Sequence, residues 1–277
     1  MTDYTNAAFK EVFEQANAGD ITAQAEILSR TAARKLGDDA LPYLQEIAEK
    51  GNVRAQGVLG TCYQFGIGVE VDPEEAVKWF RMAAEQGIAD AQYIFGVCCH
   101  EGTGVKQDNV EAVKWFRQAA EQGFPLAQYV LGTCYQFGIG VYVDPVEAVK
   151  WYRASAEQGN ADAQCNLGIC YGDQIGVRVD PKKAVKWLRK AAVQGHACAQ
   201  IKLGVCCEYG FGVKKDFVEA SNWLAAASQQ GDREAVDRLF ELCKKDATLR
   251  EAFIKAMGTA TRPEAKAPQA QLPTCKA

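Results

Sequence analysis

Apolar and polar positions along this chain follow a pattern that returns every 36 residues from residue 55 onward. Within each period, two stretches carry apolar residues three and four positions apart, which is the spacing of one face of an α-helix. The chain's five tryptophans keep this period: Trp79, Trp115, Trp151, Trp187 and Trp223. Several residue types share the same register, so the pattern predicts a repeated unit of two helices.

The polar and glycine positions predict where each helix begins and ends. The first helix of a unit is expected to start near an Ala-Gln pair such as Ala91-Gln92, and a Gly-x-Gly-Val turn follows it. The second helix is expected to start at a periodic Asp such as Asp72, which can accept hydrogen bonds from free N–H groups, with Glu75 completing a capping box. A periodic glycine such as Gly87 then supplies the left-handed residue that ends this helix.

A single unit cannot bury both of its helices. The first helix keeps Ala, Leu or Phe, Gly and Cys on one side, while the second helix offers Ala76, Val77, Trp79, Phe80 and Ala83 in the first unit. Neighbouring units must therefore stack, so we expect an all-α solenoid. Five repeats are expected over 55–234, divergent capping helices and a shortened repeat over 1–54, capping helices over 235–257, and a disordered Pro/Ala-rich tail over 258–277.

These spacings resemble the Sel-one-like repeat family, whose members are related to tetratricopeptide solenoids. In the first unit the matching positions are Ala55, Leu59, Gly60, Tyr63, Gly66, Gly68, Val69, Asp72, Ala76, Trp79, Ala83, Ala84 and Gly87. The resemblance is strong over 55–234 and weak over 19–54, and Gln174 replaces a turn glycine in the fourth unit. It implies a right-handed α/α superhelix with the first helices on its concave side, acting as an adaptor that assembles proteins. The cysteine-rich Helicobacter branch of the family binds or hydrolyses β-lactams, which supplies the alternative function.

Charge and the absence of export or membrane signals narrow the choice of partners and compartments. The net charge is −4 and the isoelectric point is near 5.4, whereas binding to nucleic acid or to an anionic membrane needs a clustered cationic surface. The first residues lack the basic and apolar segments of a signal peptide, and no apolar run is long enough to span a membrane. A cytoplasmic protein is therefore expected, with export by a specialised secretion system left open.

The cysteines are expected to be buried thiols. Five of the 11 occupy one column on the packed side of the first helix: Cys62, Cys98, Cys134, Cys170 and Cys206. Equivalent helices stand about 8–10 Å apart, whereas a disulfide needs Cα atoms within about 7 Å. No unit has a cysteine between its Asp and its closing glycine, so the disulfide framework that the Helicobacter resemblance implies is absent. An isolated Cys165–Cys198 bridge stays open.

No catalytic, metal or cofactor site is expected. Cys98, Cys99 and His100 are consecutive on a helix, so their side chains diverge instead of converging on a metal ion. Neither His100 nor His196 lies in a recognisable catalytic motif. The leading hypothesis is therefore a non-enzymatic scaffold, and the alternative is a β-lactam-binding or β-lactamase-like enzyme.

A variable stripe on the first helices is the candidate binding surface. Counted from the Ala of the Ala-Gln pair, positions 3, 7 and 10 are expected to point away from the packed side, flanked by positions 4 and 11. The stripe is richer in aromatic and aliphatic residues than a solvated face needs to be. We expect a protein or peptide ligand to contact Gln64, Phe65, Tyr93, His100, Tyr129, Gln136, Phe137 and Tyr209. The alternative interpretation is that several of these aromatics pack between adjacent units, and homo-oligomerisation is left open.

Overall fold

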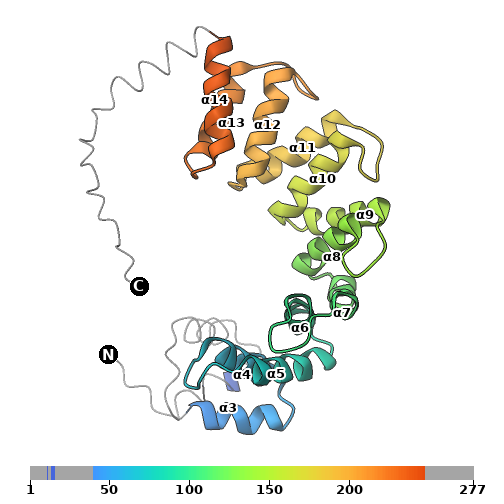
Figure 1. Cartoon of the computed structure of the whole chain (residues 1–277), viewed down its shortest axis with the longest axis vertical. Coiled ribbons are helices and arrows are strands. Elements are labelled where there is room, and N and C mark those ends of the chain that lie inside the picture. Colours follow the sequence, from blue (N-terminus) through green and yellow to red (C-terminus); the bar gives the residue numbers. More distant parts are fainter. Residues whose placement is uncertain (1–10, 12–13, 16–39, 247–277) are drawn as a thin grey trace, which may run out of the picture.

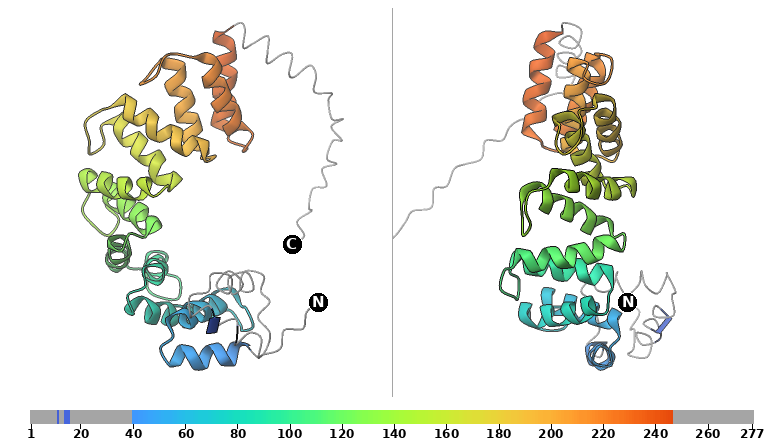
Figure 2. Two further views of the ribbon diagram at one scale, coloured as in Figure 1. Left: turned by 180° about the vertical axis from the view of Figure 1, so that it is seen from behind. Right: turned by 90° about the vertical axis from the view of Figure 1, so that its right-hand side faces the viewer.

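The chain forms an arc of stacked helix pairs. The computed structural model describes residue 11, residues 14–15 and residues 40–246. Residues 40–246 form twelve helices and no strand: α3 (Ala40–Glu49), α4 (Val53–Phe65), α5 (Pro73–Glu85), α6 (Ala89–Glu101), α7 (Asn109–Glu121), α8 (Pro125–Phe137), α9 (Pro145–Glu157), α10 (Ala161–Asp173), α11 (Pro181–Val193), α12 (Ala197–Tyr209), α13 (Phe217–Ser228) and α14 (Arg233–Lys245). Each helix packs mainly against the next one along the chain, and α6 and α8 lie on the inner side of the arc from α7 and α9 (Figure 1). The pairs stack as a single column when the arc is turned (Figure 2). The expected all-α solenoid is confirmed.

The second helices begin as predicted, with one difference at the cap. Asp72 accepts the N–H of Glu75 through Oδ1 at 3.0 Å, and the equivalent Asp caps each second helix along the stack. The predicted capping box is wrong, however. The N–H of Asp72 donates to the carbonyl of Tyr63 at 2.9 Å, so it needs no side-chain acceptor, and the Glu75 carboxylate pairs with Lys78 instead.

The first helices begin two residues before the Ala-Gln pair, as α4 does at Val53. Each ends in a left-handed residue, which is glycine in four repeats and Gln174, at φ 60°, in the fourth. The second turn glycine has a separate role. A Cβ on Gly104 would overlap the carbonyl oxygen of Pro73, because the turn of one repeat lies on the start of the second helix of the preceding repeat.

The buried residues form four clusters that follow one another along the stack. Gly60 lets α4 approach α5 so closely that a Cβ there would meet the Phe80 ring at 2.6 Å. The cysteine column is buried as predicted, Trp79 is buried, and the other four tryptophans are partly buried. At the ends of the described stack, α3 packs on α4, and α14 packs on α13 and α12. The capping helices and shortened repeat predicted before residue 40, and the segments predicted after residue 246, lie outside the described residues.

Candidate protein-binding surface

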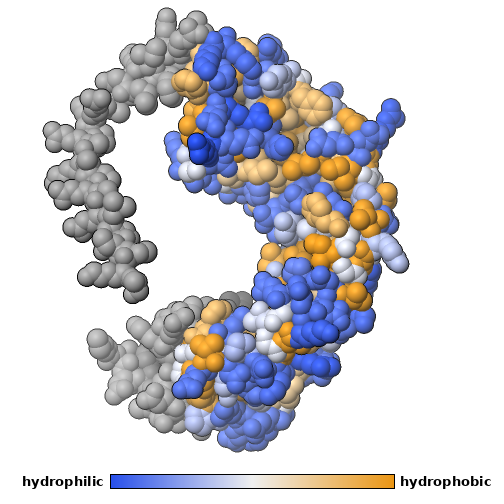
Figure 3. All heavy atoms as spheres, viewed as in Figure 1, coloured by the Kyte–Doolittle hydropathy of each residue, from blue (hydrophilic) through white to orange (hydrophobic). Residues whose placement is uncertain are grey.

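The exposed side of the first helices runs through positions 4, 7 and 11, which we call the inner stripe. Position 11 is exposed in every repeat, and positions 4 and 7 are half-buried except for the exposed Lys202. Aliphatic members of the stripe are Val58, Ile94, Val97, Val130, Ile169 and Val205, and position 11 holds Phe65, Glu101, Phe137, Asp173 and Tyr209. Hydrophobic and hydrophilic residues are interspersed along the arc in Figure 3, so its visible face has no single continuous apolar area.

Three predicted contact residues are prominent in this stripe. Phe65, Phe137 and Tyr209 are exposed by 49%, 64% and 65%, respectively, at the ends of α4, α8 and α12. Between them, at the same position of α6 and α10, stand the exposed acidic residues Glu101 and Asp173. The first helices therefore present an alternating series of aromatic and acidic side chains.

Tyr93 and Tyr129 occupy a different place, at the seams between helices. The Tyr93 ring lies 5.4 Å from that of Phe124, which precedes α8, and the Tyr129 ring lies 6.1 Å from that of Tyr152 on α9. Both tyrosines are half-buried, and burial raises the pKa of each hydroxyl. Their role as partner contacts stays a prediction.

The same position is fully packed further along the chain. Cys165 and Ile201 are only 1% and 5% exposed, so the expectation that position 3 points outward is wrong for these two repeats. Position 3 is directed toward the start of the next first helix, as the contact between Cys165 and Cys198 shows. The expectation failed because a helical wheel drawn for one helix leaves out the next first helix, which covers position 3.

Position 10 contacts another helix in three of the five repeats, through His100, Gln136 and Glu208. His100 Nδ1 lies 2.7 Å from Oδ1 of Asn109 at the start of α7, and Gln136 Oε1 accepts from the Tyr152 hydroxyl at 2.7 Å. Gln64 is half-buried at the equivalent place on α4. In the last repeat, the buried Glu208 pairs with Lys245 of α14 at 2.6 Å.

A charged hollow beside Tyr209 was missed by the sequence analysis. It has a volume of about 570 Å³ and is lined by Glu208, Tyr209, Arg233, Glu234, Asp237, Arg238, Glu241 and Lys245. Lys245 Nζ lies 5.5 Å from the centre of the Tyr209 ring, so α14 contributes to the surroundings of this aromatic residue. The departure of α14 from the repeat pattern hid the hollow, because no repeat position could be assigned to its side chains.

A second hollow lies on the turn of the third repeat. Its lining includes Val110, Tyr135 and Asp144, and Tyr142 beside them is 96% exposed. The sequence carried a signal for this site, because Tyr142 stands where the nearly identical first repeat has Glu70.

The column cysteines offer little reactivity. Burial raises the pKa of Cys62, Cys98, Cys134 and Cys170 to about 11, so these thiols are neutral and poorly nucleophilic at neutral pH. Within the described part of the chain, no three His, Cys, Asp or Glu side chains gather as a metal site would require. None of the helices described in residues 40–246 is long and apolar enough to cross a membrane.

Known proteins share both the repeat and the fold. The sequence matches the Sel1 repeat over residues 53–88, 89–124, 125–160, 161–196 and 199–232, and no curated protein matches this chain. A Sel1 repeat protein from Oxalobacter formigenes has a similar structure, with a TM-score of 0.73 and 34% identity over 79% of this chain and 90% of its own.

A second similar structure is a protective antigen of uropathogenic Escherichia coli strains with an SLR fold. Its TM-score is 0.75 at 34% identity, and the match covers 91% of this chain but 52% of the antigen, so this chain spans about half of that relative's length. The matched segments coincide with the observed helix pairs, from α4 and α5 through α12 and α13. With five such repeats over most of its length, the chain belongs to the Sel1 repeat family.

Proposed function

We propose that this chain is a non-enzymatic scaffold that binds a segment of another protein along the inner stripe. The observation that carries the proposal is the exposure of Phe65, Phe137 and Tyr209 on rigid helices. Large aromatic residues held in place by a scaffold contribute strongly to protein interfaces, because little side-chain freedom is lost when they bind. The outward side of the second helices instead carries ion pairs such as Lys78–Glu75, which suit a solvated surface.

The alternation along position 11 indicates the chemistry of the partner. Apolar side chains of a bound segment would cover the aromatic residues, and Lys or Arg side chains would lie near Glu101 and Asp173. The partner is therefore proposed to be a protein segment in which apolar and basic residues are interspersed. A cytoplasmic location is part of this proposal.

The test compares two triple variants. Phe65, Phe137 and Tyr209 are changed to Ala in one, and the exposed Met82, Val146 and Val193 of the second helices are changed to Ala in the control. Partners captured by wild type are identified by quantitative mass spectrometry, and the best is purified for calorimetric titration. The inner-stripe variant should bind at least about tenfold more weakly, equivalent to about 1.4 kcal/mol, while the control binds normally. Equal affinity of both variants, with unchanged circular dichroism, would contradict the proposal.

The enzymatic alternative has a separate test. Purified protein is incubated with a chromogenic cephalosporin, and the expected rate equals that of buffer. Turnover that follows the protein through purification and disappears in a point variant would contradict the non-enzymatic part of the proposal.

A further inference from the structure

Two cysteines from different repeats touch at the seam between α10 and α12. Cys165 is 1% exposed on α10, and Cys198 is exposed as the second residue of α12. Their side chains are in hydrogen-bonding contact, and both are free thiols. The contact joins a buried thiol to one that solvent can reach.

This pair is particular to one seam. Residues equivalent to Cys165 and Cys198 occur at each of the other junctions between repeats. They are Gly57 and Asp90, Tyr93 and Leu126, Tyr129 and Asp162, and Ile201 and Glu234. The stacking of repeats thus imposes no requirement for cysteine there. The two thiols are an addition to the fourth and fifth repeats.

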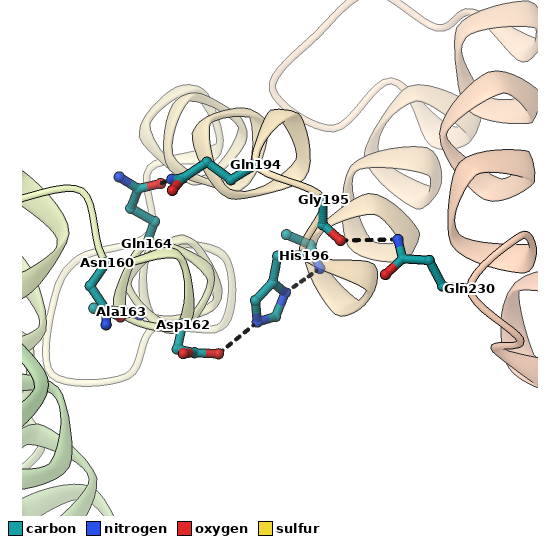
Figure 4. Close-up of polar contacts among 9 residues, drawn as sticks. Asn160, Asp162, Ala163, Gln164, Gln194, Gly195, His196 and Gln230 are labelled. Atoms are coloured by element: carbon teal, nitrogen blue, oxygen red, sulfur yellow. Dashed lines mark hydrogen bonds and ion pairs between the residues drawn. The ribbon is translucent and has the colours of Figure 1, made fainter. Parts of the chain in front are cut away.

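The start of α12 is held against α10 by a histidine (Figure 4). His196 Nδ1 accepts the backbone N–H of Ala199 at 3.2 Å, and its Nε2 lies 3.1 Å from Asp162 Oδ1. Because Nδ1 is an acceptor, Nε2 carries the proton and donates it to the carboxylate. This bridge fixes the helix start that carries Cys198 beside the helix that carries Cys165.

The surroundings give the two sulfur atoms different characters. The hydrogen bond from Cys165 lowers the pKa of Cys198, and the same bond raises the pKa of Cys165. The charge of Lys202 also lowers the pKa of Cys198, while desolvation of its sulfur and the charge of Glu234 on α14 raise it. Cys198 also lies in the first turn of α12, where the positive end of the helix dipole favours a thiolate. Cys198 is therefore the nucleophile and Cys165 the proton-bearing neighbour.

We propose that Cys198 and Cys165 form an oxidant-sensitive dithiol site, at which a hydroperoxide oxidises Cys198 and Cys165 then closes a disulfide between the fourth and fifth repeats. In the first step the Cys198 thiolate attacks the terminal oxygen of the peroxide, an S–O bond forms, the O–O bond breaks, and hydroxide (or an alkoxide, from an alkyl hydroperoxide) leaves. In the second step the Cys165 sulfur displaces the oxygen of the sulfenic acid, an S–S bond forms, and water leaves with the thiol proton. The peroxide gains two electrons, and the two thiols supply them.

The test follows the cross-link by mass spectrometry in the full chain. Cys275, which lies outside the described residues, is changed to Ser in the background protein so that it cannot compete. After brief treatment with hydrogen peroxide and alkylation, trypsin should release residues 154–178 joined to residues 191–202. The link should vanish in Cys165→Ser and Cys198→Ser. It should persist in the control Cys170→Ser, which lies in the same peptide as Cys165.

A second measurement needs no substitution at the site. Iodoacetamide at pH 7 should label Cys198 before the buried Cys134 in reduced protein, and peroxide treatment should abolish that labelling until dithiothreitol restores it. The proposal is overturned if Cys198 stays alkylatable after peroxide. It is also overturned if the link forms through Cys170, or if only cross-links between chains form. None of these three results requires the Cys165→Ser variant, so each overturns the proposal even if that variant fails to fold.

Discussion

Gln194 Nε2 donates a 2.7 Å hydrogen bond to Gln164 Oε1, joining the end of α11 to the start of α10 (Figure 4). Gln164 in turn donates through Nε2 to the carbonyl of Ala156 on α9 at 3.0 Å. One buried amide thus connects three helices from two repeats. The same arrangement recurs around Gln56, Gln92, Gln128 and Gln200.

Removing this amide should weaken the stack. Gln164→Leu removes the hydrogen bonds that this amide makes with Ala156 and with Gln194. The Ala156 carbonyl keeps the N–H of Gly159 at 3.1 Å. Because two hydrogen bonds between helices are lost at a buried position, we expect a loss of about 1–3 kcal/mol in the free energy of unfolding. Gln194→Ala should cost less, because Gln194 is exposed and water can replace it as a donor. Urea denaturation followed by circular dichroism measures the free energy of unfolding of both variants. Equal losses would contradict the larger role given to Gln164.

Two turn glycines with similar backbone angles should respond differently to the same substitution. Gly68→Ala places a side chain at φ 72° in open space, so only backbone strain of about 1 kcal/mol is expected. Gly104→Ala, at φ 68°, also forces the turn away from the Pro73 carbonyl, and we expect a total loss of about 3 kcal/mol. Thermal unfolding of the two variants separates strain from the contact between repeats, and similar melting temperatures would show that this contact is unimportant.

The fourth repeat can be stabilised by restoring glycine. Gln174 adopts φ 60°, where a side chain is unfavourable, so Gln174→Gly should raise the free energy of unfolding by about 0.5–1 kcal/mol. Gln174→Ala keeps a Cβ and should give no gain. Chemical denaturation checks the sign, and an equal gain from Ala would point to the loss of the glutamine side chain instead.

Acid should weaken the seam between the second helices of the last two repeats. Arg189 Nη1 lies 2.6 Å from Glu219 Oε1. The hydrogen bond from Arg189 lowers the pKa of Glu219 from its usual 4.5. Its stabilisation is therefore complete above the unfolded pKa and is lost as pH falls through the lower folded value. Between about pH 5 and 3, wild type should lose more stability than Glu219→Gln. Melting temperatures across this range measure the difference. The control is Glu85→Gln, which removes the exposed Arg81–Glu85 ion pair within α5. Parallel curves for wild type and Glu219→Gln would contradict it.

The sequence predicted most of the fold because its signals are local. The periodic Asp and Gly residues mark helix ends through contacts within a few residues, and the structure follows them at Asp72 and Gly87. The capping box failed because the competing acceptor for Asp72 comes from Tyr63 in the preceding helix. Such an acceptor depends on how two helices pack, which the pattern of one helix does not contain.

The candidate surface was predicted less completely for the same reason. Exposure of Phe65, Phe137 and Tyr209 agrees with the expected side of the helix. The burial of Cys165 and Ile201 depends on the next first helix, and the glutamine network depends on three helices at once. The periodicity of the glutamines was visible, but their bonding partners were not.

The turn that lies on the Pro73 carbonyl through Gly104 is repeated at Gly140, Gly176 and Gly212. Since successive junctions use equivalent backbone contacts, recombination within the gene could insert or delete a whole unit and leave the flanking junctions compatible. The near identity of residues 55–80 and 127–152 is what such an exchange would leave behind. Copy number is thus a route by which descendants of this chain can lengthen or shorten the stack, without remodelling any helix.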